Sequence, residues 1–332
     1  MTTETSTGWA VPDFPHDPVE GRPGLEVVDG AILTRVRRGR LRTILEPTAW
    51  VRGAVHDGEG RLVVSSQAIG GVEGARVAPA DPLRVPARLA TGARRLEGTW
   101  LYGGHWSEPV GSFVTETLTT LWPDDCDGAG GAGDPAVAGV RGLVFHAATG
   151  PFRGVGEVRS DLLALAGWGG LPVEVVEDDV LVADRLLVPG RSLVVNGWAW
   201  PEARVVWRRV AAAAGGPALL DPDGPRVLLS SGTADTDHDR TLQAAGFDVV
   251  RPDTLGATEL VRLLAGASVL AGANSALHVS AFAPPGVRVL VLGGHGSDDV
   301  RLPTQRVVGH VCEHPTAHLP ADLPADLSSL GL

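Results

Sequence analysis

The sequence contains no lysine, because all 28 of its basic residues are arginines. This absence excludes a Schiff-base lysine, a pyridoxal-phosphate anchor and the lysine of a P-loop. It also leaves the arginine guanidinium as the only side-chain cation that stays charged at every pH. With 39 acidic residues the net charge is −11, which argues against free nucleic acid as a partner.

Cysteines and long apolar runs are also scarce. Cys126 and Cys312 are the only two cysteines, so neither a disulfide framework nor a four-cysteine zinc site is expected. No uninterrupted apolar run reaches the ~18 residues that a membrane span requires. The first eight residues are polar and rich in threonine, without the pattern of a secretory signal. We therefore expect a cytoplasmic protein with no transmembrane segment.

The length of 332 residues and the hydrophobic content of 44% allow two domains with packed cores. We expect a flexible arm over residues 1–24 and an N-terminal domain over 25–215, with β-hairpins first and α/β structure from about residue 100. Gly215-Gly216 marks the predicted boundary. A C-terminal α/β domain is predicted over 216–310, followed by an irregular tail over 311–332.

In the N-terminal domain, a turn at Gly103-Gly104 precedes an amphipathic pattern that predicts a helix over Pro109–Leu121. A strand at 143–145, a helix over 159–166 closed by a glycine, two strands within 173–188 and a linking helix over 205–214 are also expected.

After the boundary, strands and short helices alternate. This order predicts βαβ units and a parallel sheet, whose ligands bind beyond the carboxyl ends of its strands. The expected binding loops are Ser230–Thr233, Gly272–Ser275 and Gly293–Ser297.

Several motifs occur in a fixed order along the chain: Tyr102-Gly103-Gly104, Gly111-Ser-Phe-Val-Thr-Glu116, Thr120-Leu-Trp122, Gly246-Phe-Asp-Val-Val-Arg-Pro252, Asn274-Ser-Ala-Leu-His278 and Phe282-Ala-Pro-Pro-Gly286. Together they resemble glycosyltransferase family 61, which includes capsular-polysaccharide transferases. The resemblance implies a GT-B-like α/β fold, in which two Rossmann-like domains face a cleft, here with an N-terminal β-rich extension.

The resemblance also implies an activity. We expect inverting, metal-independent transfer of a sugar from a nucleotide-sugar donor, taken to be UDP-linked, to a saccharide or related hydroxyl acceptor in surface polysaccharide synthesis. The donor is a co-substrate, no other cofactor is expected, and the oligomeric state stays open.

The chain departs from the family pattern at polar positions. Ser112 replaces the histidine of the helix motif, Ser231 replaces an arginine after the first donor-domain strand, and the loop at Gly272 is one residue shorter. These departures favour an alternative, a catalytically silent member that binds glycan or nucleotide and serves as an assembly partner.

The expected donor site lies where Gly272, Asn274 and Ser275 open a short helix, because free N–H groups at a helix start bind phosphate. His278 lies one turn further along the same helix. A simple helix cap with a core-edge histidine is the alternative. Three further donor-site candidates are Glu259, Arg262 and Ser231, although Glu259 and Arg262 also have the spacing of an ordinary helix ion pair.

For the catalytic base, which removes the proton of the acceptor hydroxyl, Glu116 is the first candidate and His105, beside Glu108, the second. A solvated glutamate and an incidental loop histidine are the alternatives.

A metal site is not expected. Asp235, Asp237 and Asp239 alternate, but the pattern is better explained by a helix cap than by a metal-bound diphosphate. His310, His314 and His318 recur every fourth residue, yet Pro315 interrupts any helix that would bring them to one face.

Overall fold

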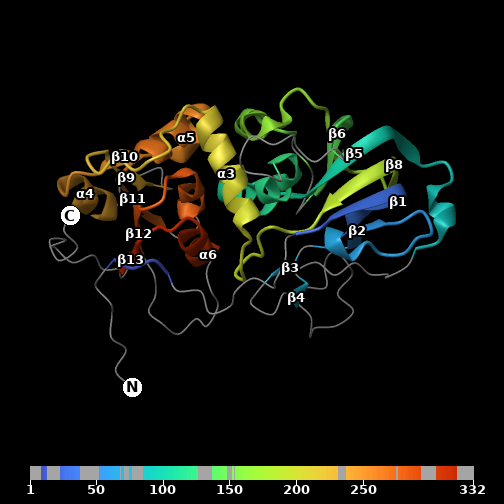
Figure 1. The fold of residues 1–332 in the computed structure, drawn as a ribbon, viewed down its shortest axis with the longest axis horizontal. Helices are drawn as coiled ribbons and strands as arrows, with labels where there is room; N and C mark the ends of the chain where they lie inside the picture. The colour runs from blue at the N-terminus through green and yellow to red at the C-terminus, as the bar shows by residue number, and fades with distance from the viewer. Residues whose placement is uncertain are drawn as a thin grey trace, which may run out of the picture.

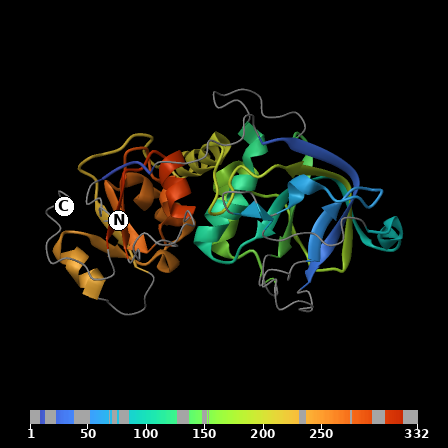
Figure 2. The ribbon, with the colours of Figure 1, turned by 90° about the horizontal axis from the view of Figure 1, so that it is seen from below.

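The computed structural model describes residues 9–12, 23–37, 52–67, 69–70, 75–76, 85–125, 137–147, 152, 154–230, 237–273, 276–292 and 304–319. They form two main β-sheets, which lie at opposite ends of the molecule with helices between them (Figures 1 and 2). Within these ranges, no helix combines the length and the apolar character needed to cross a membrane.

The first sheet has six strands in the order β2-β1-β8-β5-β6-β7. They are β1 (Leu25–Arg37), β2 (Arg52–His56), β5 (Arg94–Trp106), β6 (Val140–Ala147), β7 (Val173–Val176) and β8 (Val180–Pro189). β8, β5, β6 and β7 run parallel, whereas β1 is antiparallel to both β2 and β8. The predicted β-rich start of this half is present as β1 and β2, which belong to the same sheet as the α/β part. β3 (Ile69–Gly70) and β4 (Ala75–Arg76) form a separate pair.

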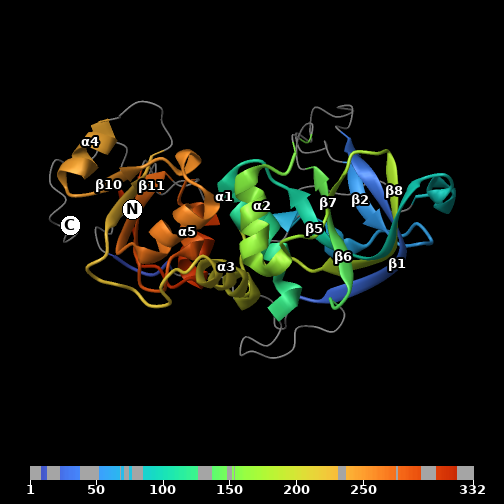
Figure 3. The same ribbon diagram turned by 90° about the horizontal axis from the view of Figure 1, so that it is seen from above.

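The helices of this half lie mainly on the side of the second sheet (Figure 3). They are η1 (Val64–Ser66), η2 (Ala87–Ala90), α1 (Val110–Ser112), the π-helix η3 (Phe113–Thr117), η4 (Leu118–Thr120), η5 (Trp122–Asp125), α2 (Glu157–Leu163) and the π-helix η6 (Ala164–Trp168). The predicted helix at Pro109–Leu121 is confirmed as the continuous run α1-η3-η4. The predicted helix at 159–166 is confirmed by α2 and η6, near whose end Gly167 has φ +92°.

The second sheet has five parallel strands in the order β10-β9-β11-β12-β13. They are β9 (Arg226–Leu229), β10 (Asp248–Val250), β11 (Val269–Ala273), β12 (Arg288–Leu292) and β13 (Thr316–Leu319). The helices are α4 (Asp237–Ala244), η7 (Pro252–Thr254), α5 (Ala257–Gly266), the 3₁₀ helix η8 (Ala276–Phe282) and α6 (Thr304–Val311). The predicted βαβ alternation is confirmed. In chain order the strands are arranged 2-1-3-4-5, as in doubly wound nucleotide-binding sheets.

Both chain ends contribute to the second sheet. The prediction of an irregular tail is wrong at Thr316–Leu319, which forms the edge strand β13. Residues 9–12 do not form the predicted free arm either, because Ala10 bridges Thr316 in antiparallel fashion and the Arg288 guanidinium lies over the Trp9 ring. An edge strand is a liability unless something covers it, and this N-terminal segment covers part of β13.

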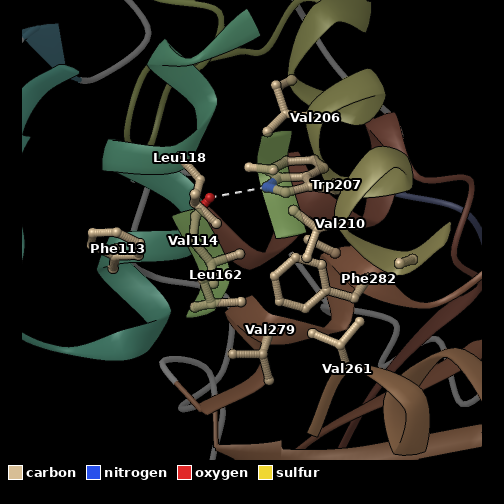
Figure 4. Close-up of a cluster of buried hydrophobic side chains, with 14 of the residues drawn as sticks. Phe113, Val114, Leu118, Leu162, Val206, Trp207, Val210, Val261, Val279 and Phe282 are labelled. Carbon is tan, nitrogen blue, oxygen red and sulfur yellow. Dashed lines mark hydrogen bonds between the residues drawn. The ribbon is translucent and has the colours of Figure 1, made fainter. Parts of the chain in front are cut away.

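Helix α3 (Pro201–Ala213) joins the two halves through a shared core. Its Trp207 is fully buried, and the indole N–H donates to the carbonyl oxygen of Val114 at 2.9 Å. Figure 4 shows this indole between Val114 and Leu118 of the first half and Phe282 of the second. Because protein cores are densely packed, the segment after β5 is held against η8 in a fixed arrangement.

We predict that Trp207→Phe destabilises the protein by about 2–4 kcal/mol, because it loses buried volume and leaves the Val114 carbonyl without its donor. The free energy of unfolding in urea measures this loss. Leu219→Ala, at a side chain that is 82% exposed, is the control and should stay within about 0.5 kcal/mol of the wild type. A Trp207→Phe protein as stable as that control would show that the shared core does not hold the halves together.

Candidate functional site

Polar side chains gather at the carboxyl ends of three neighbouring parallel strands. His105 lies near the end of β5, His146 near the end of β6, and Arg191 two residues after β8. His105 is also paired with His146 in the register of β5 and β6. Because parallel strands end at the same edge, chain-distant residues meet there, and this is the edge at which such sheets bind ligands.

A bulge at Gly103-Gly104 makes room for this cluster. Tyr102 pairs with Val144 and His105 with His146, so β5 holds one more residue than β6 between these pairs. A Cβ on Gly103 would lie 1.9 Å from a Phe145 ring atom. Gly104 has φ +80°, and a Cβ there would lie 2.7 Å from Nη1 of Arg191. What the sequence indicated as a turn is a β-bulge that lets the guanidinium approach the backbone.

The Arg191 guanidinium bridges two of the predicted site residues. Its Nη2 lies 3.2 Å from Nδ1 of His105, and its Nη1 donates to the backbone carbonyl oxygen of Glu116 at 3.4 Å. Since arginine can only donate, Nδ1 of His105 accepts and the ring proton belongs on Nε2. Burial and the Arg191 charge hold the pKa of His105 well below its ordinary value, so the ring is neutral at pH 7. His105 is therefore a hydrogen-bond donor through Nε2, which is buried and has no partner among the described residues.

Glu116 lies in the π-helix η3. Its carboxyl group interacts electrostatically with the Arg191 guanidinium. Burial raises the pKa of Glu116, and this effect outweighs the Arg191 charge and a hydrogen bond from Ser112, which both lower it. Single-turn π-helices of this kind are frequent at functional sites. Ser112, where the family pattern has histidine, thus contacts the very carboxylate that the sequence identified as the candidate base.

A second series of hydrogen bonds links Tyr102, His146 and Thr34 next to this cluster. The Tyr102 hydroxyl lies 2.8 Å from Nδ1 of His146, and Nε2 of His146 lies 2.9 Å from the carbonyl oxygen of Thr34. The carbonyl must accept from Nε2–H, so Nδ1 accepts the tyrosine proton. Burial lowers the pKa of His146 to about 4 and raises that of Tyr102. His146 is thus neutral, with both ring nitrogens occupied, and it ties β1, β5 and β6 together.

Threonines of the helical run fasten it to the end of β5. The hydroxyl of Thr117 donates to the carbonyl oxygen of His105 at 2.8 Å, and that of Thr120 donates to Gly103 at 2.7 Å. Ser192, next to Arg191, donates to the carbonyl oxygen of Thr119. These bonds fix the helix that carries Glu116 relative to His105 and Arg191.

The predicted donor-site residues are only partly described. Gly272 lies in β11, where a Cβ would be 3.1 Å from the carbonyl oxygen of Leu229 and 3.4 Å from Cγ of Leu277. A Cβ at Gly272 would therefore need only a small shift of neighbouring protein atoms. His278 is half-buried on η8, and burial lowers its pKa to about 4. Three predicted residues lie outside the described ranges: Ser231, Asn274 and Ser275.

Glu259 and Arg262 are both exposed on α5. The Nε of Arg262 donates to the carbonyl oxygen of Ala214 at the end of α3, so this guanidinium caps a helix. The predicted pairing of Arg262 with Glu259 is not among the ion pairs of the described residues. The expectation that Glu108 meets His105 is wrong as well, because its carboxylate pairs with Arg159 at 3.2 Å.

No three histidine, cysteine, aspartate or glutamate side chains of the described part gather as a metal site would need. Asp239 accepts a hydrogen bond from Ser230 at 3.1 Å, while Asp235 lies outside the described residues. His310 and His314 have separate partners, since they lie 2.9 Å from the carbonyl oxygen of Pro12 and 3.3 Å from that of Ala283.

Comparisons with known proteins identify no relative, so the site is interpreted from its chemistry. No family model matches the chain, and no curated protein matches it either.

Sequence reasoning found His105 and Glu116 but missed Arg191 and His146. Both follow or end apolar strand patterns, Leu-Val-Phe-His146 and Leu-Leu-Val-Pro-Gly-Arg191. The carboxyl-end rule that we applied to the second sheet would have identified both residues in the first.

Gly104→Ala should move the Arg191 guanidinium away from His105, because the new Cβ would occupy its position. We expect the pKa of His105, followed by NMR of the imidazole resonances, to rise as the neighbouring charge withdraws. The stability loss should match that of Gly92→Ala, about 1–2 kcal/mol, because Gly92 has φ +77° with nothing within 4 Å of its Cβ. An unchanged His105 titration would contradict the contact.

The depressed pKa of His146 predicts a pH dependence of stability. Its folded value of about 4 lies below the unfolded value of about 6.5, so the unfolded state binds the proton more readily. The stabilisation is complete above pH ~6.5 and is lost as the pH falls toward ~4. When the pH is lowered from 7.5 to 5, the free energy of unfolding should fall for both proteins. The fall should be about 1–2 kcal/mol smaller for His146→Gln than for the wild type. Equal losses would show that His146 accepts a proton in the folded protein.

Proposed function

We propose that this protein is an inverting, metal-independent glycosyltransferase that moves a sugar from a UDP-linked or similar nucleotide donor to a saccharide hydroxyl, in the synthesis of a surface polysaccharide. Glu116 acts as the base. Its carboxylate takes the proton of the acceptor hydroxyl, the oxygen attacks the anomeric carbon, and the bond to the donor diphosphate breaks with its electron pair on the diphosphate. His105 is a donor that orients an oxygen of the substrate.

One observation carries the proposal: Glu116 is a half-buried carboxylate next to a fixed cation at the carboxyl edge of a parallel sheet. A general base works best when its pKa lies near the working pH. Burial raises the pKa of Glu116, and Arg191 limits the rise. His105 fits the base role less well, because its Nδ1 faces an arginine donor and its Nε2 carries the proton.

The second sheet supports the donor part of the proposal. The strand order 2-1-3-4-5 puts the switch point between β9 and β11, and sheets of this type bind nucleotides at the switch point. η8, the helix after β11, packs against α1 and η3, the helical run after β5. Segments that follow the carboxyl ends of both sheets therefore meet. A two-domain GT-B-like arrangement, with donor on the second sheet and acceptor on the first, would bring its substrates to this junction.

A catalytically silent protein that binds glycan or nucleotide is the second candidate. It is favoured by Arg262, one of the predicted donor-site residues, because its Nε donates to the carbonyl oxygen of Ala214 at a helix end.

Glu116→Gln should lower turnover about 10²–10⁴-fold, the usual contribution of a general base, and leave nucleotide-sugar affinity unchanged. The assay screens nucleotide sugars and saccharide acceptors by mass spectrometry, and calorimetry measures donor binding. Glu108→Gln is the matched control, because that carboxylate lies on the adjoining loop and pairs with Arg159. It should retain turnover near the wild-type rate.

Transfer by the wild type should also continue in excess EDTA. A reversible loss of transfer on chelation would overturn the metal-independent mechanism. Donor binding without transfer by the wild type would select the silent protein, and full turnover by Glu116→Gln would remove Glu116 as the base.

A further inference from the structure

Arg191 differs in its contacts from four other partly buried arginines of the described chain. Arg159 pairs with Glu108 and Arg204 with Glu313. Arg208 and Arg209 instead donate to the carbonyl oxygens of Ala283 and Ala166, near the ends of helices. Carboxylate pairing or helix capping accounts for all four. Arg191 has neither kind of partner, because it reaches only an imidazole and a carbonyl within a helical run.

The charge of Arg191 is therefore only partly compensated. No carboxylate in the described part of the chain forms an ion pair with it, although Glu116 attracts it from a longer distance. The neighbouring rings of His105 and Tyr102 are neutral at pH 7, since burial holds the first deprotonated and the second protonated. Burying a cation costs free energy unless an anion accompanies it, so the cluster lacks an anionic partner.

The guanidinium is also built to stay in place. The Gly104 bulge leaves room for it, and Ser192, the next residue, is bound to Thr119. Arg191 as a whole residue is half-buried rather than fully enclosed. Its planar fork of N–H donors matches the oxygens of a carboxylate or phosphate. In the same cluster, the Nε2–H of His105 has no acceptor within the part of the chain that the structure describes, and buried unsatisfied donors of this kind often mark ligand sites.

We propose that Arg191 binds an oxyanion, the carboxylate or phosphate group of an acidic sugar, at the carboxyl edge of the first sheet. The claim that a sugar carries this group rests on the proposed function. The claim that the ligand has an oxyanion follows from the side chains alone. Acidic sugars are in this account the acceptors, because the site belongs to the half that carries the base.

Glu116 gives the proposal a distinctive signature. Its carboxylate and a bound oxyanion both face Arg191 and repel each other. Removing the Glu116 charge should therefore strengthen oxyanion binding, while removing the Arg191 charge should weaken it. A site at which Arg191 is only structural would show neither effect. The other titratable groups around the cluster are Tyr102, His105, His146 and His56. His105 and His146 are neutral at pH 7, so each supplies one donor or acceptor rather than a full charge.

The experiment measures binding of glucuronate, glucose 6-phosphate and glucose to the full-length protein by calorimetry at pH 7.5. We expect the wild type to bind at least one acidic sugar about tenfold or more tightly than glucose, as charge-assisted hydrogen bonds allow. Preference for glucuronate identifies a carboxylate, and preference for glucose 6-phosphate identifies a phosphate. Equal binding of all three, or no binding, overturns the proposal without reference to any variant.

Variants locate the site. Arg191→Gln should weaken acidic-sugar binding about tenfold or more, and Glu116→Gln should strengthen it several-fold. Arg185→Gln, an exposed arginine on β8, is the matched control and should bind like the wild type. Circular dichroism verifies folding, and Arg191→Lys, which retains the charge, should recover part of the affinity. Unchanged binding in a folded Arg191→Gln protein overturns the assignment.

These results are distinct from those that test transfer. Acidic-sugar binding in a protein that transfers no sugar would retain the oxyanion site and reject the transferase. Transfer to neutral acceptors alone would retain the transferase and reject the oxyanion site.

Discussion

The candidate site depends on one constraint, the placement of the Arg191 charge within the protein against the backbone of β5. The guanidinium fits there only because Gly104 has no Cβ and adopts a positive φ. Its charge then sets the state of its neighbours, since it helps to keep His105 neutral and restrains the rise in the pKa of Glu116. Without that cation, burial would still lower the pKa of His105, but the pKa of Glu116 would rise further.

A second constraint relates this cluster to the other half of the molecule. Trp207 of α3 binds the Val114 carbonyl, two residues before Glu116, and packs in the same core as Phe282 of η8. The helix that carries the candidate base and the helix that follows β11 are thus parts of one buried structure. Any ligand that bridges the two sheets would meet a junction whose geometry is already fixed, which lowers the ordering cost of binding.

Most of the second sheet was predictable because its strands and helices are regular and separated by glycine or proline. β13 was missed because Pro315 precedes it, and proline in a short segment argues against regular structure until the neighbouring strand is known. β5 was interpreted as a turn because Gly103-Gly104 has turn composition, whereas the bulge is defined by pairing with β6. Glu116 and His105 stood out as chemical groups within one local motif. Arg191 lies far along the chain and meets them through sheet topology, so it is found only when the carboxyl-end rule is applied to the first sheet.

The most direct test of the central claim, that the Arg191 cluster is where ligand binds, is an NMR titration of the histidine-labelled protein with glucuronate and glucose 6-phosphate. The ring signals of His314, which lies in the second half and is fully buried, serve as an internal reference. If ligand binds at the Arg191 cluster, at least one acidic sugar should shift the His105 signals saturably, while His314 stays unchanged and glucose has no effect. Shifts that omit His105, or that appear equally with glucose, would contradict the claim.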